Sequence, residues 1–285
     1  MPPLYLVQQN TKIRIRNRRV QVEDESVDPP EVLASIPLAQ VEQVFLFGNV
    51  GLTTPAIEAF LEQNSEVIFL SQRGEYRGRL VGRLTPHVPL RREQYARTGE
   101  SAFVLEMAKC FVVAKLSHQR ALLLRHNREH ADSEIESVIG QMRISIESMS
   151  HKTALPSLLG VEGSATAAYF RGLRRLFDSK WKFDDRNRRP PRDPVNVLLS
   201  FGYTLLAEAA ASAVQTVGLD PYDGFLHADK YGRPALVLDL MEEFRSVISD
   251  SMVLRTVNNR MLSMDDFIVE QEESGPKVTL KKPAM

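Results

Sequence analysis

Cysteine is almost absent from this sequence, with one, Cys110, in 285 residues. A single thiol forms neither an internal disulfide nor a cysteine-ligated zinc cluster, so a disulfide-stapled fold is excluded. Cys110 lies among apolar residues of a helical stretch. We expect it to fill the core, in a protein that stays in a reducing compartment.

Long apolar runs are also lacking. The longest uncharged run, from Val195 to Ala207, is too short to cross a bilayer and is followed by Glu208. The amino-terminal residues MPPLYLVQQN contain no basic segment that leads into an apolar one, so we expect no signal peptide. These features predict a cytoplasmic protein with no membrane partner.

Neither sign of charge is in excess, since 36 basic residues balance 36 acidic ones. A chain that is basic throughout is excluded, but a basic surface is not, because the local distribution of charge sets the field that a phosphate backbone meets. The segment from Arg171 to Arg192 holds nine basic residues and three aspartates. Its candidate DNA-binding residues are Arg171, Arg174, Arg175, Arg186, Arg188 and Arg189.

The amino-terminal part of the sequence predicts strands. KIRIRNRRVQVED alternates charged and apolar residues with a turn near Asn17, and VEQVFLFG and EVIFLS are β-branched and aromatic runs. Between these two runs, TTPAIEAFLEQN has the cap, the proline and the apolar spacing of one short helix. A stretch rich in Gly, Pro and Arg follows, at 76–94, and predicts extended chain.

Beyond this stretch the apolar residues take helical spacing, so the fold class expected is α+β. Helices are predicted at about 133–150, 164–178, 195–217 and 234–255. The 195–217 helix is apolar nearly all round, which predicts a central, buried element. We expect a small β-rich domain over 1–78, a linker over 79–95 and a larger all-α catalytic domain over 96–285.

A further helix is predicted before these, with Val104, Met107, Phe111 and Lys115 on one face. Because a lysine has a long aliphatic stem, we expect Lys115 to bury its stem on this face and to expose its charged head.

Candidate site residues stand in apolar surroundings. His227 lies in the turn-prone segment GFLHADKYGRP, and the next helix carries Asp239 and Glu242, three residues apart. Glu162 is expected at the start of a helix that continues into a basic stripe. Each has an ordinary alternative: a solvated Glu–Arg pair, a loop histidine, or a glutamate favoured by a helix dipole. Together, oxygen ligands and one imidazole favour Mg²⁺ or Mn²⁺ over zinc or copper.

The order of the motifs GVEGSATAAYF, DPVNVLLSFGYTLL, GFLH and GRPALVLDLMEEFR resembles the CRISPR-associated adaptation integrases of the Cas1 family over nearly the whole chain. In that family a Glu, a His and an acidic residue of the DLME helix bind a divalent metal. Position by position, the resemblance makes Glu162, His227 and Glu242 the catalytic metal ligands. It makes Asp239 a support for these ligands or an alternative ligand, and Tyr169 a candidate for orienting a phosphate, with a core role as the alternative.

The resemblance also implies an activity and partners. The enzyme would join the 3′-hydroxyl ends of short DNA fragments, the spacers, to a CRISPR repeat by transesterification, with Mg²⁺ or Mn²⁺ as cofactor. Its partners would be double-stranded DNA, both spacer precursor and repeat, a second copy of the chain, and the small Cas2 protein. We expect the β-rich domain to form the homodimer through the apolar residues of VEQVFLFGNVGLTTPAIEAF.

Two other functions stay open. The same site could cut DNA by hydrolysis without joining it, as a metal-dependent nuclease. The chain could also be a catalytically silent DNA-binding or assembly subunit, because the family usually continues with another helical segment, whereas this sequence stops at KVTLKKPAM, soon after an expected short hairpin.

Overall fold

The alternating segment near the amino terminus forms a β-hairpin in the computed structural model. Strands β2 (Thr11–Arg16) and β3 (Arg19–Asp24) pair antiparallel. Asn17 and Arg18 join them with φ values of 50° and 58°, which is the left-handed backbone of a two-residue hairpin turn. The turn expected near Asn17 is thus confirmed. The structure describes residues 3–82, 86–188, 190–227, 230–272 and 275–281.

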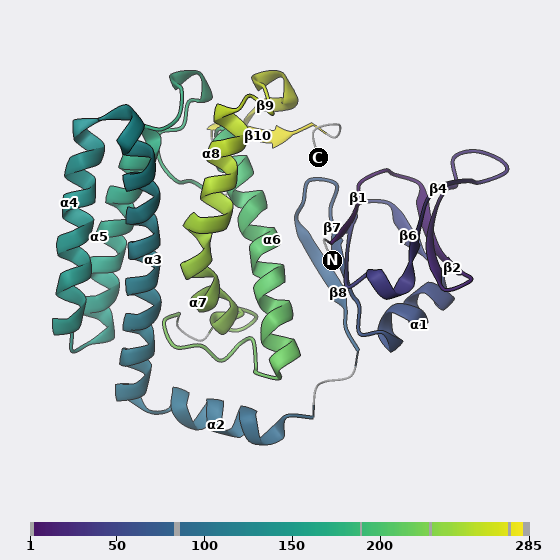
Figure 1. The fold of residues 1–285 in the computed structure, drawn as a ribbon, viewed down its shortest axis with the longest axis horizontal. Helices are drawn as coiled ribbons and strands as arrows, with labels where there is room; N and C mark the ends of the chain where they lie inside the picture. Colours follow the sequence, from purple (N-terminus) through teal and green to yellow (C-terminus); the bar gives the residue numbers. More distant parts are fainter. Residues whose placement is uncertain (1–2, 83–85, 189, 228–229, 273–274, 282–285) are drawn as a thin grey trace. The chain divides into compact units, whose positions relative to one another are not determined.

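Residues 3–82 form one compact unit of two four-stranded sheets and a helix (Figure 1). The strand orders are β4-β3-β2-β6 and β1-β5-β7-β8. The other elements are β1 Leu4–Leu6, β4 Glu31–Pro37, β5 Gln43–Phe47, β6 Val50–Leu52, α1 Thr54–Glu62, β7 Glu66–Leu70 and β8 Tyr76–Leu80. Their inward apolar residues share one core, which includes Ile13, Val20, Val44, Phe60 and Val67.

The apolar residues expected to form a dimer contact are buried. Residues 44–47 are at most 2% exposed, and the ring of Phe45 stacks on that of Tyr5. Val44 and Leu46 belong to this core, and β5 is an inner strand, paired with β1 on one side and β7 on the other. The expectation that these residues offer an interface is wrong.

Residues 86–281 form a second unit, which is mostly helical. The helices are α2 Val88–Thr98, α3 Ser101–His130, α4 Ser133–Ser148, α5 Leu155–Arg174, α6 Pro194–Val217, α7 Ala235–Phe244 and α8 Ser251–Asn258, and a π-helical segment, Arg245–Asp250, joins α7 to α8. Strands β9 (Phe267–Glu272) and β10 (Gly275–Leu280) pair antiparallel. The α+β class is confirmed, as is the short hairpin near the end of the sequence.

Helix α3 is central in this unit, since it contacts α4, α5, α7 and the π segment. Its stripe of Ala108, Val112, Leu116 and Leu123 is 0% exposed and joins the main core. The same turn of the helix leaves Cys110 exposed. The expectation that Cys110 fills the core is therefore wrong.

Helix α6 is buried along one stripe only. Val195, Leu199 and Val214 are at most 2% exposed, whereas Val217 is 57% exposed. The expectation of a helix buried all round is wrong, although α6 does contact α7, α8 and β10. Among the described helices, α6 has a length and composition that would suit a membrane span, a test that core helices of soluble proteins also pass.

Two element boundaries differ from those expected. Helix α5 begins at Leu155 with a proline in its first turn, so Glu162 lies inside the helix and not at its dipole-bearing start. Most of 76–94, expected as extended linker, is regular structure, with β8 at Tyr76–Leu80 and the first turns of α2 from Val88. The local composition was outweighed there by pairing of β8 with β7 and packing of α2 on α3.

The π segment redirects the helix that carries Glu242. A π-helical turn holds an extra residue, which rotates the residues after it relative to a regular helix. Ser246, Ser249 and Asp250 are consequently at most 3% exposed. The sequence predicts one helix over about 234–255, and helical spacing from Val237 and Met241 would place Val247 and Ile248 on the same apolar stripe. They are instead 50% and 46% exposed, so this stripe is correct up to Met241 and wrong beyond it.

Candidate metal centre

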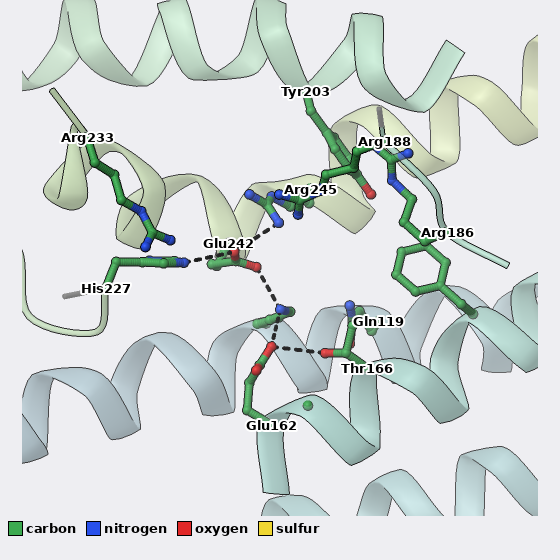
Figure 2. Close-up of a pocket in the computed structure, with 13 residues that line it drawn as sticks. Gln119, Glu162, Thr166, Arg186, Arg188, Tyr203, His227, Arg233, Glu242 and Arg245 are labelled. Carbon is green, nitrogen blue, oxygen red and sulfur yellow. Dashed lines mark hydrogen bonds and ion pairs between the residues drawn. The ribbon is translucent and has the colours of Figure 1, made fainter. Parts of the chain in front are cut away.

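Glu162, His227 and Glu242 line one cavity of about 300 Å³ in the helical unit (Figure 2). Glu162 comes from α5, His227 from the loop that precedes α7, and Glu242 from α7 itself. Segments 80 residues apart in the sequence thus face the same space. The remaining lining residues are Lys115, Gln119, Gly163, Thr166, Phe170, Arg186, Arg188, Tyr203, Arg233 and Arg245.

The loop that carries His227 is built on the carboxylate of Asp239, which is 0% exposed. Asp239 Oδ2 accepts the backbone N–H groups of Phe225 and Leu226 at 2.6 and 2.9 Å. Its Oδ1 accepts the backbone N–H of His227 at 3.0 Å and lies 2.6 Å from His227 Nδ1. With Nδ1–H donating to Asp239, a neutral imidazole keeps its lone pair on Nε2, which lies 3.9 Å from Glu242 Oε1.

Asp239 therefore has the position of a carboxylate that orients a metal-binding histidine. Both of its oxygens already accept N–H groups, which leaves it poorly suited to the alternative role of direct ligand. Gly224 allows the close approach of this loop to α7. A Cβ atom there would lie 2.7 Å from the carbonyl carbon of Ala235 and 2.8 Å from Asp239 Oδ2.

Glu242 is 4% exposed and is surrounded by positive charge. Arg245 Nη1 lies 2.9 Å from its Oε1, and Lys115 Nζ lies 2.8 Å from its Oε2. Burial acts to raise the pKa of Glu242, but Arg245, Lys115 and His227 together outweigh burial, and the pKa is lowered. The carboxylate is therefore ionised at neutral pH.

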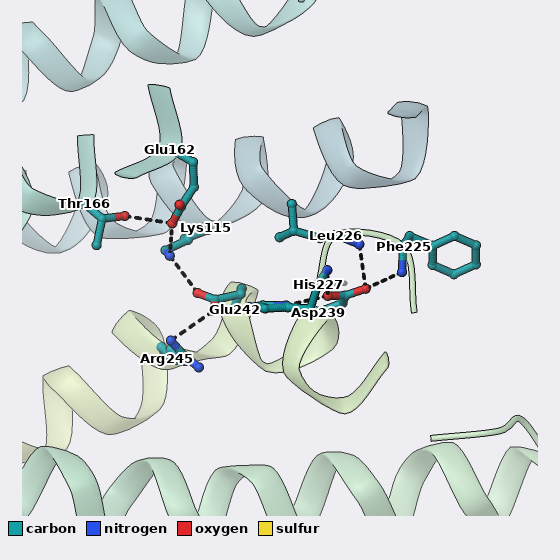
Figure 3. A network of polar contacts seen from close by, with 9 residues as sticks. All are labelled: Lys115, Glu162, Thr166, Phe225, Leu226, His227, Asp239, Glu242 and Arg245. Atoms are coloured by element: carbon teal, nitrogen blue, oxygen red, sulfur yellow. Dashed lines mark hydrogen bonds and ion pairs between the residues drawn. The ribbon is translucent and has the colours of Figure 1, made fainter. Parts of the chain in front are cut away.

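Lys115 links Glu242 to Glu162 (Figure 3). Its Nζ forms an ion pair with Glu162 Oε1, which also accepts the hydroxyl of Thr166 at 3.0 Å. Lys115 is 6% exposed, so the expectation that its head reaches solvent is wrong. The sequence placed Lys115 on the apolar face but carried no signal for the direction of its charged head, because a lysine on such a face can also extend its head to solvent.

The three predicted ligands suit a hard divalent cation. Two carboxylates and one imidazole nitrogen form a donor set suited to Mg²⁺ or Mn²⁺. Glu242 Oε2 accepts no well-directed hydrogen bond from the described residues, so it retains lone pairs for a ligand. Across the described ranges, no three His, Cys, Asp or Glu side chains are yet close enough to hold one ion. The role of Glu162, His227 and Glu242 as metal ligands stays a prediction.

Tyr169 points into the core and not into the cavity. It is 0% exposed, and its hydroxyl donates to Asp250 Oδ2 at 2.6 Å. The hydroxyl of Tyr203 donates to the other oxygen, Oδ1, at 2.7 Å. The role of orienting a phosphate is wrong for Tyr169, because its hydroxyl is buried and already bonded. Tyr203, which the sequence did not single out, lines the cavity.

Four arginines line the cavity: Arg186, Arg188, Arg233 and Arg245. Two of them were among the candidate DNA-binding residues. The guanidinium carbons of Arg186 and Arg245 lie 5.2 and 5.0 Å from the ring centroid of Tyr203, a distance at which cation and ring attract. Arg189, also a candidate, lies outside the described residues.

The other three candidate arginines lie at the end of α5, apart from the cavity lining. Arg174 and Arg175 form ion pairs of 2.8 Å with Asp184 and Asp132. Arg171 donates to a glutamine side chain. Exposed ion pairs of this kind contribute little to stability, so they do not prevent contact with DNA. Their DNA-binding role stays a prediction.

Comparison with known proteins points to one family. A family model described as "CRISPR associated protein Cas1" matches residues 4–285. A CRISPR-associated endonuclease Cas1 of Thermus thermophilus is 38% identical over 248 residues, which are 87% of this chain and 72% of that protein. A Cas4/Cas1 fusion of Geobacter sulfurreducens is 38% identical over 275 residues, 93% of this chain. The match covers 48% of the fusion, so the chain spans about half the length of that relative.

A solved structure extends the likeness to the fold. A chain of a Cas6-RT-Cas1–Cas2 complex matches with a TM-score of 0.82 and 26% identity, over 99% of this chain and 31% of that one. The matched region contains all four motifs on which the family resemblance rested. The resemblance inferred from the sequence is confirmed.

Asp250 gives a prediction on stability. Burial, which outweighs the two tyrosine hydroxyls and the arginines, raises the pKa of Asp250 from 3.8 to about 6. Because the folded pKa is the higher one, folding favours the protonated form, and this stabilisation is lost as pH rises from about 4 to about 6. Asn cannot ionise, so the stability of Asp250→Asn relative to wild type should rise by about 2 kcal/mol between pH 4 and pH 7.

Urea unfolding at both pH values measures this difference. The same substitution at Asp184, whose side chain is 87% exposed, controls for the loss of a surface carboxylate. If the stability of Asp250→Asn relative to wild type does not change with pH, the pKa of Asp250 is the same in the folded and unfolded states, and the prediction is wrong.

Proposed function

This chain belongs to the CRISPR-associated protein Cas1 family, and on that basis we propose that it is a metal-dependent DNA integrase of CRISPR adaptation. In the reaction, the 3′-hydroxyl of a short DNA fragment loses its proton and attacks a phosphodiester of the repeat, and a deoxyribose oxygen of the repeat leaves and takes up a proton. One phosphodiester replaces another, so no covalent protein intermediate is needed. The observation that carries the proposal is that Glu162, His227 and Glu242, from three separate segments, line one cavity with four arginines.

The acidic side of the cavity would hold Mg²⁺ or Mn²⁺ through Glu162, His227 and Glu242. When bound there, a divalent cation supplies Lewis acidity, which polarises a phosphate and lowers the pKa of a hydroxyl. The chain's own part is to present these groups ready for use. Asp239 keeps His227 with its Nε2 lone pair free, and Arg245 keeps Glu242 ionised.

The basic side of the cavity would hold the DNA backbone. Negative charge accumulates on the phosphate oxygens during the displacement, and fixed guanidinium groups stabilise that charge. Arg186 is fixed by hydrogen bonds to Asn196 and Ser200, at 2.7 and 3.1 Å. Arg186 and Arg245 are also held against the ring of Tyr203. Phosphate contacts of this kind position DNA but do not read its sequence.

Partners follow from the reaction and from the family. The substrates would be double-stranded DNA, as spacer precursor and as repeat. Cas2 is the further protein partner that we propose, supported by the similar chain in a complex with Cas2. We place the reaction in the cytoplasm, and we assign the unit of residues 3–82 to the pairing of two copies.

The site is tested by strand joining. Protein, Cas2, short duplex DNA and a plasmid that carries the repeat are incubated with Mn²⁺, and joined and cut products are separated on a gel. We expect Glu162→Gln, His227→Ala and Glu242→Gln each to lower joining roughly 100-fold or more, because each removes a ligand. Asp239→Asn should lower it about 10- to 100-fold, the usual effect of losing the group that orients a ligand.

Glu243→Gln is the matched control, because Glu243 is next to Glu242 on α7 but does not line the cavity. Normal joining by Glu162→Gln would refute the site. Cut but never joined products would favour the nuclease that the relative's name describes. DNA binding with neither product would favour a silent assembly subunit.

The cavity arginines are tested against those of α5. Arg188→Ala should weaken binding to all DNA sequences alike and lower the slope of log affinity against log salt by about 1. Arg174→Ala removes the same charge from the end of α5, where Asp184 already pairs with it, and should change both quantities less. Fluorescence anisotropy at several salt concentrations measures both. Equal losses of DNA affinity in the two variants would show that the DNA backbone also contacts the surface at the end of α5.

A homodimer is proposed because two DNA ends must be joined a fixed distance apart, and a twofold interface supplies that spacing. An apolar surface is available on edge strand β4, where Val32 and Leu33 are 48% and 43% exposed. We expect light scattering to give a molar mass twice that of one chain. The substitution Leu33→Asp should lower this mass toward that of the monomer. Leu159→Asp, at an exposed leucine of α5, is the control.

A wild-type protein that is monomeric at micromolar concentration contradicts the dimer. A dimer that survives Leu33→Asp places the interface elsewhere on the chain.

A further inference from the structure

The ammonium group of Lys115 lies between the two carboxylates that we assign to the metal. Lys115 comes from α3, Glu162 from α5 and Glu242 from α7. The side chains of Lys115 and Glu242 are 7% and 4% exposed. In Figure 3 the lysine forms the bridge from one carboxylate to the other.

The contact of Lys115 with Glu242 is a short ion pair. Lys115 Nζ is 2.8 Å from Glu242 Oε2, yet among the described residues this oxygen accepts no hydrogen bond of good geometry. An ammonium group is a compact point charge on a flexible stem. It compensates the carboxylates by charge and proximity, which are also the means by which a metal ion would compensate them.

Two cations cannot both occupy this place. Glu242 is buried and the Glu162 side chain is 18% exposed. Two such carboxylates repel each other, so a cation between them lowers the cost of holding them together even in the metal-free protein, although Arg245 also pairs with Glu242. A divalent cation on the same oxygens would stand within a few ångströms of the ammonium, where like charges repel strongly because the site is largely buried. Binding of one therefore opposes the presence of the other.

We propose that Lys115 is the resident counter-ion of the site, which holds Glu162 and Glu242 together until a divalent cation displaces its ammonium group. The inference rests on the proposed function, since it takes these carboxylates as metal ligands. Lys115 is a positioning residue in this role. Its withdrawal is feasible because the side chain has an unbranched stem and lines a cavity of about 300 Å³.

Manganese binding tests this role without any measurement of activity. Free Mn²⁺ is followed by electron paramagnetic resonance as it is added to wild type and to Lys115→Met, in the absence of DNA. Because the competing charge is gone, we expect Lys115→Met to bind Mn²⁺ at least about tenfold more tightly. Lys115→Arg, which keeps the charge, should bind no more tightly than wild type.

Lys109→Met is the matched control. Lys109 lies on the same helix and pairs with Glu106 at 2.9 Å, on a surface where the glutamate is 69% exposed. This variant loses the same charge and should bind Mn²⁺ as wild type does.

Melting temperatures separate a counter-ion from a simple structural tie between α3, α5 and α7. Both roles predict that Lys115→Met melts several degrees below wild type in EDTA. Only the counter-ion role predicts that Mn²⁺ raises the melting temperature of Lys115→Met more than that of wild type, since tighter binding stabilises more.

The outcomes distinguish this inference from the proposed function. If wild type binds Mn²⁺ and Lys115→Met binds it equally or more weakly, the role of Lys115 is refuted and the metal site stands. If neither protein binds Mn²⁺, both ideas are refuted. Binding by Lys115→Met alone would show that the lysine competes with the ion, but it would refute displacement of the ammonium group by a divalent cation.

A measurement on wild type covers the case in which Lys115→Met does not fold. With ¹⁵N-labelled lysine, the buried ammonium of Lys115 should give a protected NMR signal, assigned by its loss in Lys115→Arg. We expect this signal to vanish on titration with Mg²⁺, because the displaced ammonium exchanges its protons with water. A signal that persists at saturating Mg²⁺ would overturn the inference.

Discussion

Three carboxylates on one helical stretch, Asp239, Glu242 and Asp250, are at most 4% exposed. The helical unit depends on supplying them with hydrogen-bond donors or positive charges. A buried carboxylate without donors or cations is costly. Each therefore contacts another element. Asp239 binds the loop of His227, and Glu242 pairs with Lys115 of α3. Asp250 accepts the hydroxyls of one tyrosine of α5 and one of α6. The contacts that hold the helices in register are thus the contacts that shape the cavity.

The π segment is what allows one helix to bury all three. Up to Met241 the helix turns its apolar residues inward, as a regular amphipathic helix does. The extra residue of the π turn then directs Ser249 and Asp250 inward, and leaves Val247 and Ile248 half exposed. Apolar burial is given up there, and Asp250 accepts the hydroxyls of Tyr169 and Tyr203, the second of which lines the cavity. π turns are frequent at functional sites.

The cavity gathers charged groups of both signs. Glu162, Glu242 and the imidazole of His227 are groups that attract a cation, and Arg186, Arg188, Arg233 and Arg245 are groups that attract phosphate. A phosphodiester and a cation bound there together would each find groups of opposite charge. The neutral net charge of the whole chain, 36 against 36, does not reveal this local concentration of charged groups, because local distribution and not the sum sets the field.

The sequence by itself determined the fold class, several elements and the residues of the candidate site. Alternation of apolar residues was enough for the β2–β3 hairpin, helical spacing was enough for α4 and α7, and the family motifs singled out Glu162, His227 and Glu242. Only the tertiary structure decided that Lys115 points its charge inward, that Asp250 is buried and that Cys110 is exposed. The physical reason is that periodicity reports which face of an element is apolar, whereas the cost of burying a charge depends on partners brought by other elements, distant in the sequence.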